Sequence, residues 1–209
     1  MAALVSQFGA ALLAVQGALL RSVETAGTVQ RAGNLVVISL DRETFFMEQG
    51  SLEPEGVQRF RRLAEREIED FLASNEWALT GPLSVNILLR SLPNSCDVRV
   101  EHCRTFFTVT VRDDEGTHTL PVRWPRVVAG RMHEAHPRAF VPVMDSTRAF
   151  SREHLLLSYQ DLELCVQFMG RNPTSLNDQM LARDESAVLH TGDVIRCGPY
   201  SLTVNAIVS

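Results

Sequence analysis

The sequence contains no lysine, so all twenty of its basic residues are arginines. Twenty-five acidic residues leave a net charge of −5, which argues against broad, salt-driven binding to nucleic acid. The G-x-x-x-x-G-K-[ST] phosphate loop, the dinucleotide fingerprint and the G-x-S-x-G nucleophile turn are all missing. Ser151 and His154 are three residues apart, but no carboxylate stands out to orient the imidazole as a base. We therefore expect a protein that is not an enzyme.

Ligand patterns for metals are also missing. The four cysteines form no C-x-x-C pair and show no zinc-site spacing, so we interpret them as small buried residues in a reducing cytoplasm. Two pairs, His102 with Cys103 and His133 with His136, are the alternative. Neither pair has a third and fourth ligand at a recognisable spacing. We expect no metal and no cofactor.

The first twenty residues carry no charged side chain. A signal peptide normally opens with basic residues, and none precede this run; Gln7 and Gln16 also interrupt it. Two interpretations remain, a helix packed on its own domain or on a partner, and a membrane-associated helix. We expect a cytoplasmic protein without integral membrane insertion, able to reach the inner face of the membrane through its partner or through residues 1–22. The apolar stripe of this helix is Val5, Phe8, Leu12, Val15 and Leu19.

Residues 1–103 alternate between helical and strand patterns. The β-branched run 35–40 predicts a buried strand, and Pro54 suits the first turn of a helix that ends near residue 75. Arg61 and Glu65 are expected to pair on its exposed face. Further strands are expected at 83–89 and 97–103. The N-terminal part is therefore predicted to be a small α+β domain.

The pattern changes near residue 104, beyond which no long helical stripe is found. Short β-rich runs are separated by turn signals such as Asp113-Asp114-Glu115-Gly116. Many short strands at regular spacing are typical of a β-sandwich. We predict two domains, 1–103 and 104–209, in an α+β protein whose second domain is all β. The expected strands are 106–111, 117–122, 126–129, 155–158, 162–168, 194–197 and 200–204.

Arginines gather in one segment of this second domain. Six lie between Pro121 and Arg152, opposed by Glu134 and Asp145, so the segment has a net charge of +4 within an acidic chain. A local positive field on an acidic protein suits a small dianionic target better than a polymer. The alternative is an ordinary solvated charged face. Only a more specific sequence pattern can exclude it.

Four motifs supply that pattern, and together they resemble the forkhead-associated (FHA) domain family over roughly residues 104–209. Val127 to Arg131 resembles the strand and Gly-Arg pair that begin the family pattern, and Phe150 to His154 resembles its S-R-x-H segment. Gly170 to Asp178 resembles the S-R-N-G-T-F-V-N-G loop. Leu189 to Arg196 resembles the L-x-x-G-D-x-I closing hairpin.

The resemblance implies an all-β sandwich that binds a phosphothreonine-containing partner without chemical change. The arginine fork can hold two phosphate oxygens at once. The implied contact residues are Arg131, Ser151, Arg152, Arg171 and Asn172. The implied supporting residues are Gly130, His154, Thr174 and Asn177.

Some positions depart from the family pattern. Pro173 and Asp178 stand in place of glycines, and Ser175 in place of an aromatic residue. Residues 132–150, between the Gly-Arg pair and Ser151, are expected to form an extended loop. These departures keep open a rival interpretation, an FHA-fold scaffold that docks partners independently of phosphorylation.

The N-terminal part resembles the first domain of FhaA-type bacterial signalling proteins. The resemblance rests on the leading helix, the 35–40 strand, the arginine-rich helix and the turn from Trp77 to Pro82. It implies an adaptor in serine/threonine-kinase signalling, whose partner is such a kinase or its substrate.

Overall fold

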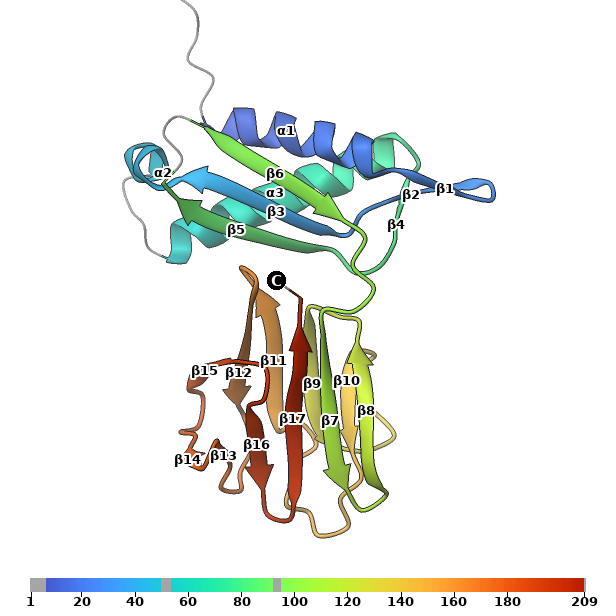
Figure 1. Cartoon of the computed structure of the whole chain (residues 1–209), viewed down its shortest axis with the longest axis vertical. Coiled ribbons are helices and arrows are strands. Elements are labelled where there is room, and N and C mark those ends of the chain that lie inside the picture. The colour runs from blue at the N-terminus through green and yellow to red at the C-terminus, as the bar shows by residue number, and fades with distance from the viewer. Residues whose placement is uncertain (1–6, 50–53, 92–94, 209) are drawn as a thin grey trace, which may run out of the picture. The chain divides into compact units, whose positions relative to one another are not determined.

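A computed structural model describes residues 7–49, 54–91 and 95–208. The chain divides into two compact units, the first ending at Arg104 and the second beginning at Thr105. Each unit has its own sheets and its own core (Figure 1).

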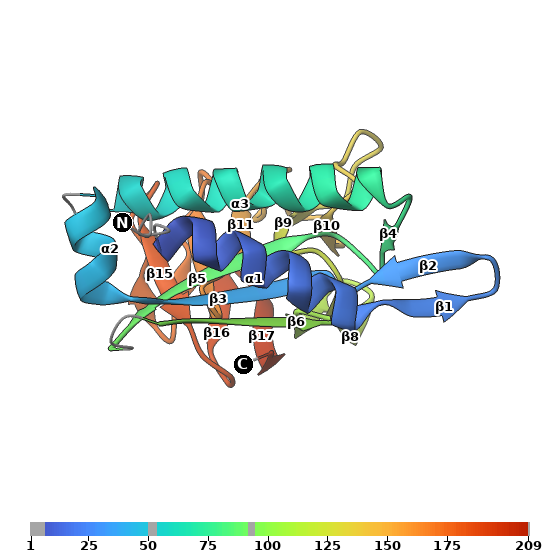
Figure 2. The same cartoon turned by 90° about the horizontal axis from the view of Figure 1, so that it is seen from above.

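The first unit is built on a three-stranded sheet of order β5-β3-β6. Strand β3 is parallel to β5 and antiparallel to β6. Helices α1 and α3 lie along the sheet (Figure 2), and both contribute to its core. The elements are α1 (Gln7–Ser22), β1 (Glu24–Ala26), β2 (Val29–Ala32), β3 (Leu35–Asp41), α2 (Arg42–Gln49), α3 (Pro54–Ser74), β4 (Ala78–Leu79), β5 (Ser84–Arg90) and β6 (Cys96–Glu101).

The core of the first unit forms where the two long helices meet the sheet. Leu19 of α1, Ile68 of α3 and Ile38 of β3 are each at most 1% exposed. Phe8 stacks on Phe60 with ring centroids 4.5 Å apart. The leading helix therefore packs on its own unit, although Val5 of the predicted stripe lies outside the described residues. In the described ranges, the structure contains no helix with the length and apolarity needed to span a membrane.

The arginine at the centre of α3 departs from its predicted place. Arg61 is buried, and its Nε donates a hydrogen bond to the Val85 carbonyl at 2.9 Å. The prediction that it lies on the exposed face is therefore wrong. Its position in the helix turns it towards β5, where the long stem can pack while the guanidinium meets a backbone acceptor.

The second unit is a sandwich of two sheets. One has the order β10-β9-β11-β12-β15 and the other β14-β13-β16-β17-β7-β8. Alternate residues along β7, β11 and β12 are buried, as the facing sheets of a sandwich require. The strands are β7 (Phe107–Asp113), β8 (Gly116–Val122), β9 (Arg126–Arg131), β10 (Phe140–Val143), β11 (Leu155–Gln160), β12 (Glu163–Phe168), β13 (Ser175–Leu176), β14 (Gln179–Met180), β15 (Ser186–Leu189), β16 (Val194–Cys197) and β17 (Tyr200–Ile207).

The predicted fold class, an α+β part followed by a β-sandwich, is confirmed. The expected extended loop at 132–150 is only partly a loop, because it contains strand β10, which pairs in parallel with β9. The strand runs from Phe140 to Val143, and Pro142 within it weakens the local strand pattern. The edge strands β8 and β10 carry Pro121 and Pro142 respectively.

Candidate functional site

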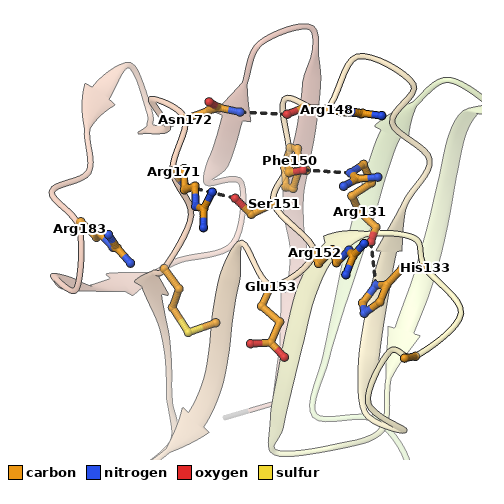
Figure 3. A pocket seen from close by; sticks show the side chains of 12 residues that line it. Arg131, His133, Arg148, Phe150, Ser151, Arg152, Glu153, Arg171, Asn172 and Arg183 are labelled. Atoms are coloured by element: carbon orange, nitrogen blue, oxygen red, sulfur yellow. Dashed lines mark hydrogen bonds between the residues drawn. The ribbon is translucent and has the colours of Figure 1, made fainter.

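A cavity of about 820 Å³ opens among the loops of the second unit (Figure 3). Its walls come from the end of β9 and residues 133–135 after it, from residues 148–153, from 169–172 and from the segment between β14 and β15. Among the described residues that line it, five are arginines and one, Glu153, is acidic. All five contact residues implied by the sequence line this cavity: Arg131, Ser151, Arg152, Arg171 and Asn172.

Gly130 allows two chain segments to approach closely at the edge of the cavity. A Cβ atom at this position would lie 2.0 Å from the carbonyl oxygen of Arg152. The backbone N–H of Arg131 donates to the Ser151 carbonyl at 2.9 Å, and that of His154 donates to Ala129 at 3.0 Å. This close approach places the side chains of Arg131 and Ser151 in the wall of one cavity.

Arg131 is half-buried and held by its own neighbours. Its Nε donates to the Phe150 carbonyl at 3.4 Å. Its carbonyl accepts a hydrogen bond from Nδ1 of His133 at 3.1 Å. Because the side-chain bond uses Nε alone, the two terminal nitrogens of the guanidinium are left to meet a ligand.

Residues 144–150 owe their shape to Asp145. Its carboxylate accepts hydrogen bonds from Phe150 N at 2.6 Å and from Thr147 N at 2.8 Å. Burial raises the pKa of Asp145, but these hydrogen bonds outweigh it and keep the pKa below the ordinary value. The charged carboxylate thereby fixes the position of Phe150, whose carbonyl holds Arg131.

Ser151 joins the Arg131 side of the cavity to the opposite loop. Its Oγ accepts a hydrogen bond from the backbone N–H of Arg171 at 3.2 Å. A hydroxyl that accepts through its oxygen can still donate its hydrogen. The arrangement therefore holds Ser151 in place and keeps one donor for a ligand.

His154 connects the same two loops from below the cavity and is fully buried. Its Nδ1 accepts a hydrogen bond from Ser151 N at 3.0 Å, so its Nε2 carries the proton and donates to Thr174 Oγ1 at 2.7 Å. Thr174 in turn donates to the Asn172 carbonyl at 3.1 Å. Burial lowers the pKa of His154 to about 4, with a smaller opposing effect from Asp145. The imidazole is therefore neutral near pH 7.

The same contacts argue against a Ser–His catalytic pair. The imidazole of His154 faces the backbone N–H of Ser151, not its hydroxyl. A base that activates a serine needs a hydrogen bond to the hydroxyl itself.

Asn172 secures the rim of the cavity. Its side-chain nitrogen donates to the carbonyls of Arg148 and Ala149, at 2.9 and 2.7 Å. Arg148 has a positive φ of 64°, an uncommon backbone conformation for a residue with a side chain. With both amide hydrogens directed to this loop, Asn172 has its Oδ1 left to accept a hydrogen bond from a ligand.

Asn177 lies outside the cavity lining and closes a neighbouring hairpin. It donates to the Asp193 carboxylate at 2.7 Å and accepts from Val194 N at 2.9 Å. Asp178, where the family pattern has glycine, adopts a positive φ of 67°. Aspartate tolerates this conformation better than most residues, so the turn keeps its shape without the glycine.

Two arginines of the cavity escaped the sequence analysis as contact candidates. Arg148 belongs to the cationic segment but matches no motif, and Arg183 lies outside that segment altogether. Only the fold brings the chain between β14 and β15 beside residues 144–154. Histidines of both pairs considered as metal ligands have other partners: His102 contacts Thr80 and the Ser22 carbonyl, and His133 donates to the Arg131 carbonyl. No group of three or more His, Cys, Asp or Glu residues suited to a metal ion occurs within the described ranges.

A sandwich that presents a cationic cavity on its loops has the architecture of a binding module. Residues 127–198 match the model of the FHA domain family. The second unit therefore contains an FHA domain. Strands β7, β8 and β17 lie outside the matched residues, yet they pair with one another and with β16 in the same sandwich.

Several solved FHA domains are similar to this unit. The FhaA FHA domain, complexed with the intracellular domain of Rv3910, is 25% identical over 46% of this chain and 99% of its own, with a TM-score of 0.38. A domain from a study of phosphothreonine-dependent FHA interactions is 25% identical over 49% of this chain and 99% of its own, with a TM-score of 0.39. The N-terminal FHA domain of S. cerevisiae Rad53p, bound to a phosphothreonine peptide, is 19% identical over 48% and 94%, with a TM-score of 0.37. None of the curated proteins compared with the chain matches it.

Proposed function

We propose that the cavity binds a phosphothreonine-containing segment of a partner protein and leaves the phosphate chemically unchanged. The observation that carries the proposal is the convergence of Arg131, Ser151 and Arg171 on one cavity of an FHA domain. A phosphate dianion offers several strong acceptors, and these three residues offer charged and neutral donors. The protein then acts as an adaptor.

Each contact residue has a distinct role in this proposal. The terminal nitrogens of Arg131 hold two phosphate oxygens in a fork, and the Ser151 hydroxyl donates to a third. Arg152 and Arg171, both exposed at the cavity, add positive charge. Asn172 accepts a backbone N–H of the bound segment through Oδ1, since its amide hydrogens bind Arg148 and Ala149.

Two features support a competent site despite the departures from the family pattern. Pro173 has no positive φ, so the loop does not require glycine there. Thr174 remains buried against His154. These features favour a competent phosphate site over the rival interpretation of a scaffold that ignores phosphorylation.

The two units are proposed to correspond to domains 1–103 and 104–209, with the first related to FhaA-type proteins. On that basis the partner would be a serine/threonine kinase or its substrate, in the cytoplasm or at the inner face of the membrane. A fragment spanning 104–209 should retain any phosphopeptide binding, and a fragment spanning 1–103 should show none.

The decisive experiment screens the full chain against matched phosphothreonine and unphosphorylated peptide libraries, then titrates a selected peptide by calorimetry. We expect Arg131→Ala to weaken binding by about 2–5 kcal/mol, as loss of a buried charge-assisted contact does. Arg126→Ala is the matched control, because Arg126 is an exposed arginine of the same strand that does not line the cavity. Equal affinity of wild type and Arg131→Ala, or equal binding of phosphorylated and unphosphorylated peptides, would contradict the proposal.

A further inference from the structure

The cavity carries more positive charge than one phosphate can neutralise. Its five arginines and single glutamate amount to four net positive charges. A phosphothreonine side chain brings about −1.5 to −2. About two positive charges would therefore remain unmatched with a ligand that carries a single phosphate.

Arg183 comes from a different segment of the fold than the residues assigned to the phosphate. In Figure 3 it lies across the view from Arg131, with Ser151 and Arg171 between them. It comes from the segment between β14 and β15, whereas Arg131 ends β9. If Arg131 and Ser151 bind the phosphate, Arg183 would therefore contact a different part of the ligand.

The backbone around Arg183 is fixed although its side chain is exposed. Asp184 N donates to the Phe168 carbonyl at 2.8 Å, and the Asp184 carbonyl accepts from the Gln167 side chain at 3.4 Å. Two bonds thus tie the segment to β12, which also leads into the loop of Arg171. Arg183 is held at the cavity by the sandwich.

The ion pair that the Arg183 guanidinium forms with Asp184 is weak. Its Nε lies 4.0 Å from the carboxylate of Asp184, and the two side chains are 67% and 73% exposed. An exposed ion pair at this distance contributes little. A ligand anion that reached Arg183 could displace the Asp184 carboxylate at a small cost in free energy.

On the basis of the proposed function, we propose that the ligand carries a second anionic group near the phosphothreonine and that Arg183 binds this group. The group is a carboxylate or a second phosphate on the same segment, since both accept a bidentate arginine. Arg171, between Arg183 and Ser151 in Figure 3, would share its charge between the two anions. Preference for a doubly anionic segment is then a specificity of this site, separate from the recognition of phosphothreonine by Arg131.

The test uses the full chain and the phosphothreonine peptide selected from the library, with its acidic residues other than phosphothreonine replaced by alanine. Two series of this peptide carry one glutamate, or one phosphoserine, at successive positions on either side. We expect at least one position to bind wild type about fivefold more tightly than the parent peptide does, and this gain to weaken with added salt. In Arg183→Gln the gain disappears, while affinity for the parent peptide changes less than about twofold, a difference of about 0.4 kcal/mol.

Arg112→Gln serves as the control, because it removes the same charge from an exposed position in β7 outside the cavity; it should keep the gain. A gain with glutamate identifies an acidic residue as a sufficient second anion, and a gain with phosphoserine alone identifies a second phosphate. No gain at any position, or a gain that survives in Arg183→Gln, overturns the inference and leaves the proposed function standing. If the phosphorylated parent binds no better than its unphosphorylated form, both fail.

Discussion

Asn34 of the first unit and His154 of the second are both fully buried polar side chains, and the two units use them differently. In the first unit Asn34 donates to the carbonyls of Pro82 and Cys103, both at 3.0 Å, and accepts from Cys103 N at 2.9 Å. In the second unit His154 receives one hydrogen bond from Ser151 N and donates one to Thr174. Both side chains join segments that are distant in the sequence.

The difference lies in what the joined segments present. The partners of Asn34 are backbone groups of turns, so its bonds close the first unit on itself. The partners of His154 belong to loops that also carry Ser151 and Asn172, which line the cavity. A buried polar group can thus stabilise a fold in one place and hold a binding surface in another.

The strongest way to break this comparison is to force β9 away from residues 151–152, which lie next to His154 in one of the loops that it joins. Gly130→Ala would place a methyl group 2.0 Å from the Arg152 carbonyl oxygen and 2.7 Å from its carbon. We expect a loss of more than about 4 kcal/mol in the free energy of unfolding of the second unit, and loss of peptide binding. Urea unfolding monitored by near-UV circular dichroism would measure the free energy of unfolding. Calorimetry with the peptide would measure binding.

The matched change in the first unit is Gly17→Ala in helix α1. A Cβ there would meet only the end of the Arg21 side chain, at 3.5 Å. Alanine is favoured over glycine in a helix by about 0.5–1 kcal/mol, so this variant should be stabilised and bind peptide normally. A Gly130→Ala protein with wild-type stability and affinity would show that the close approach does not hold the site.

Truncation of the two buried polar side chains tests their roles directly. Asn34→Ala and His154→Ala should each cost about 3 kcal/mol of unfolding free energy, because both leave buried hydrogen-bonding groups unpaired. Only His154→Ala should also lower phosphopeptide affinity, measured below the temperature at which either variant begins to unfold. Reduced affinity in Asn34→Ala would mean that the first unit takes part in binding.

Acid should affect the second unit through His154. Its pKa in the folded protein is about 4, below the ordinary value of about 6.5. Between these values the unfolded chain binds a proton that the folded chain does not, so stability falls as pH falls. The stabilising contribution of His154 to the free energy of unfolding is complete above about pH 6.5. About 3 kcal/mol of this contribution is lost by about pH 4.

His154→Gln provides the control for this acid effect, since glutamine does not titrate. Urea midpoints measured from about pH 7 to about pH 4.5 should decline more steeply in wild type than in this variant. Parallel declines would assign the acid sensitivity to other groups.

The smallest expected effect is that of Pro173→Gly. Proline restricts its own φ and the conformation of Asn172 before it, and the loop has no positive φ at either residue. We expect a loss of about 0.4–1 kcal/mol in stability, from greater freedom of the unfolded chain, and less than about a threefold change in peptide affinity. A gain in affinity of tenfold or more would show that proline impairs the site.

Sequence patterns predicted the parts of the molecule that depend on local periodicity or on contiguous motifs. The β-branched run 35–40 forms the buried strand β3, as predicted. Arg183 and Arg61 could not be placed in this way. Their surroundings come from strands and loops far away in the chain, and a charged residue in a helix or loop gives no local sign that the fold will bring it to a cavity or to β5.

The prolines of the edge strands bear on how the protein behaves when crowded. Each sheet of the second unit has two edges: β8 and β10 carry Pro121 and Pro142, and β14 and β15 are only two and four residues long. Proline cannot donate to an added strand, and short edges offer few bonds. In the proposed function, copies gathered at one multiply phosphorylated partner would therefore resist polymerisation through the edges of the second unit. Such copies could remain individually exchangeable, each released when its own phosphate is removed.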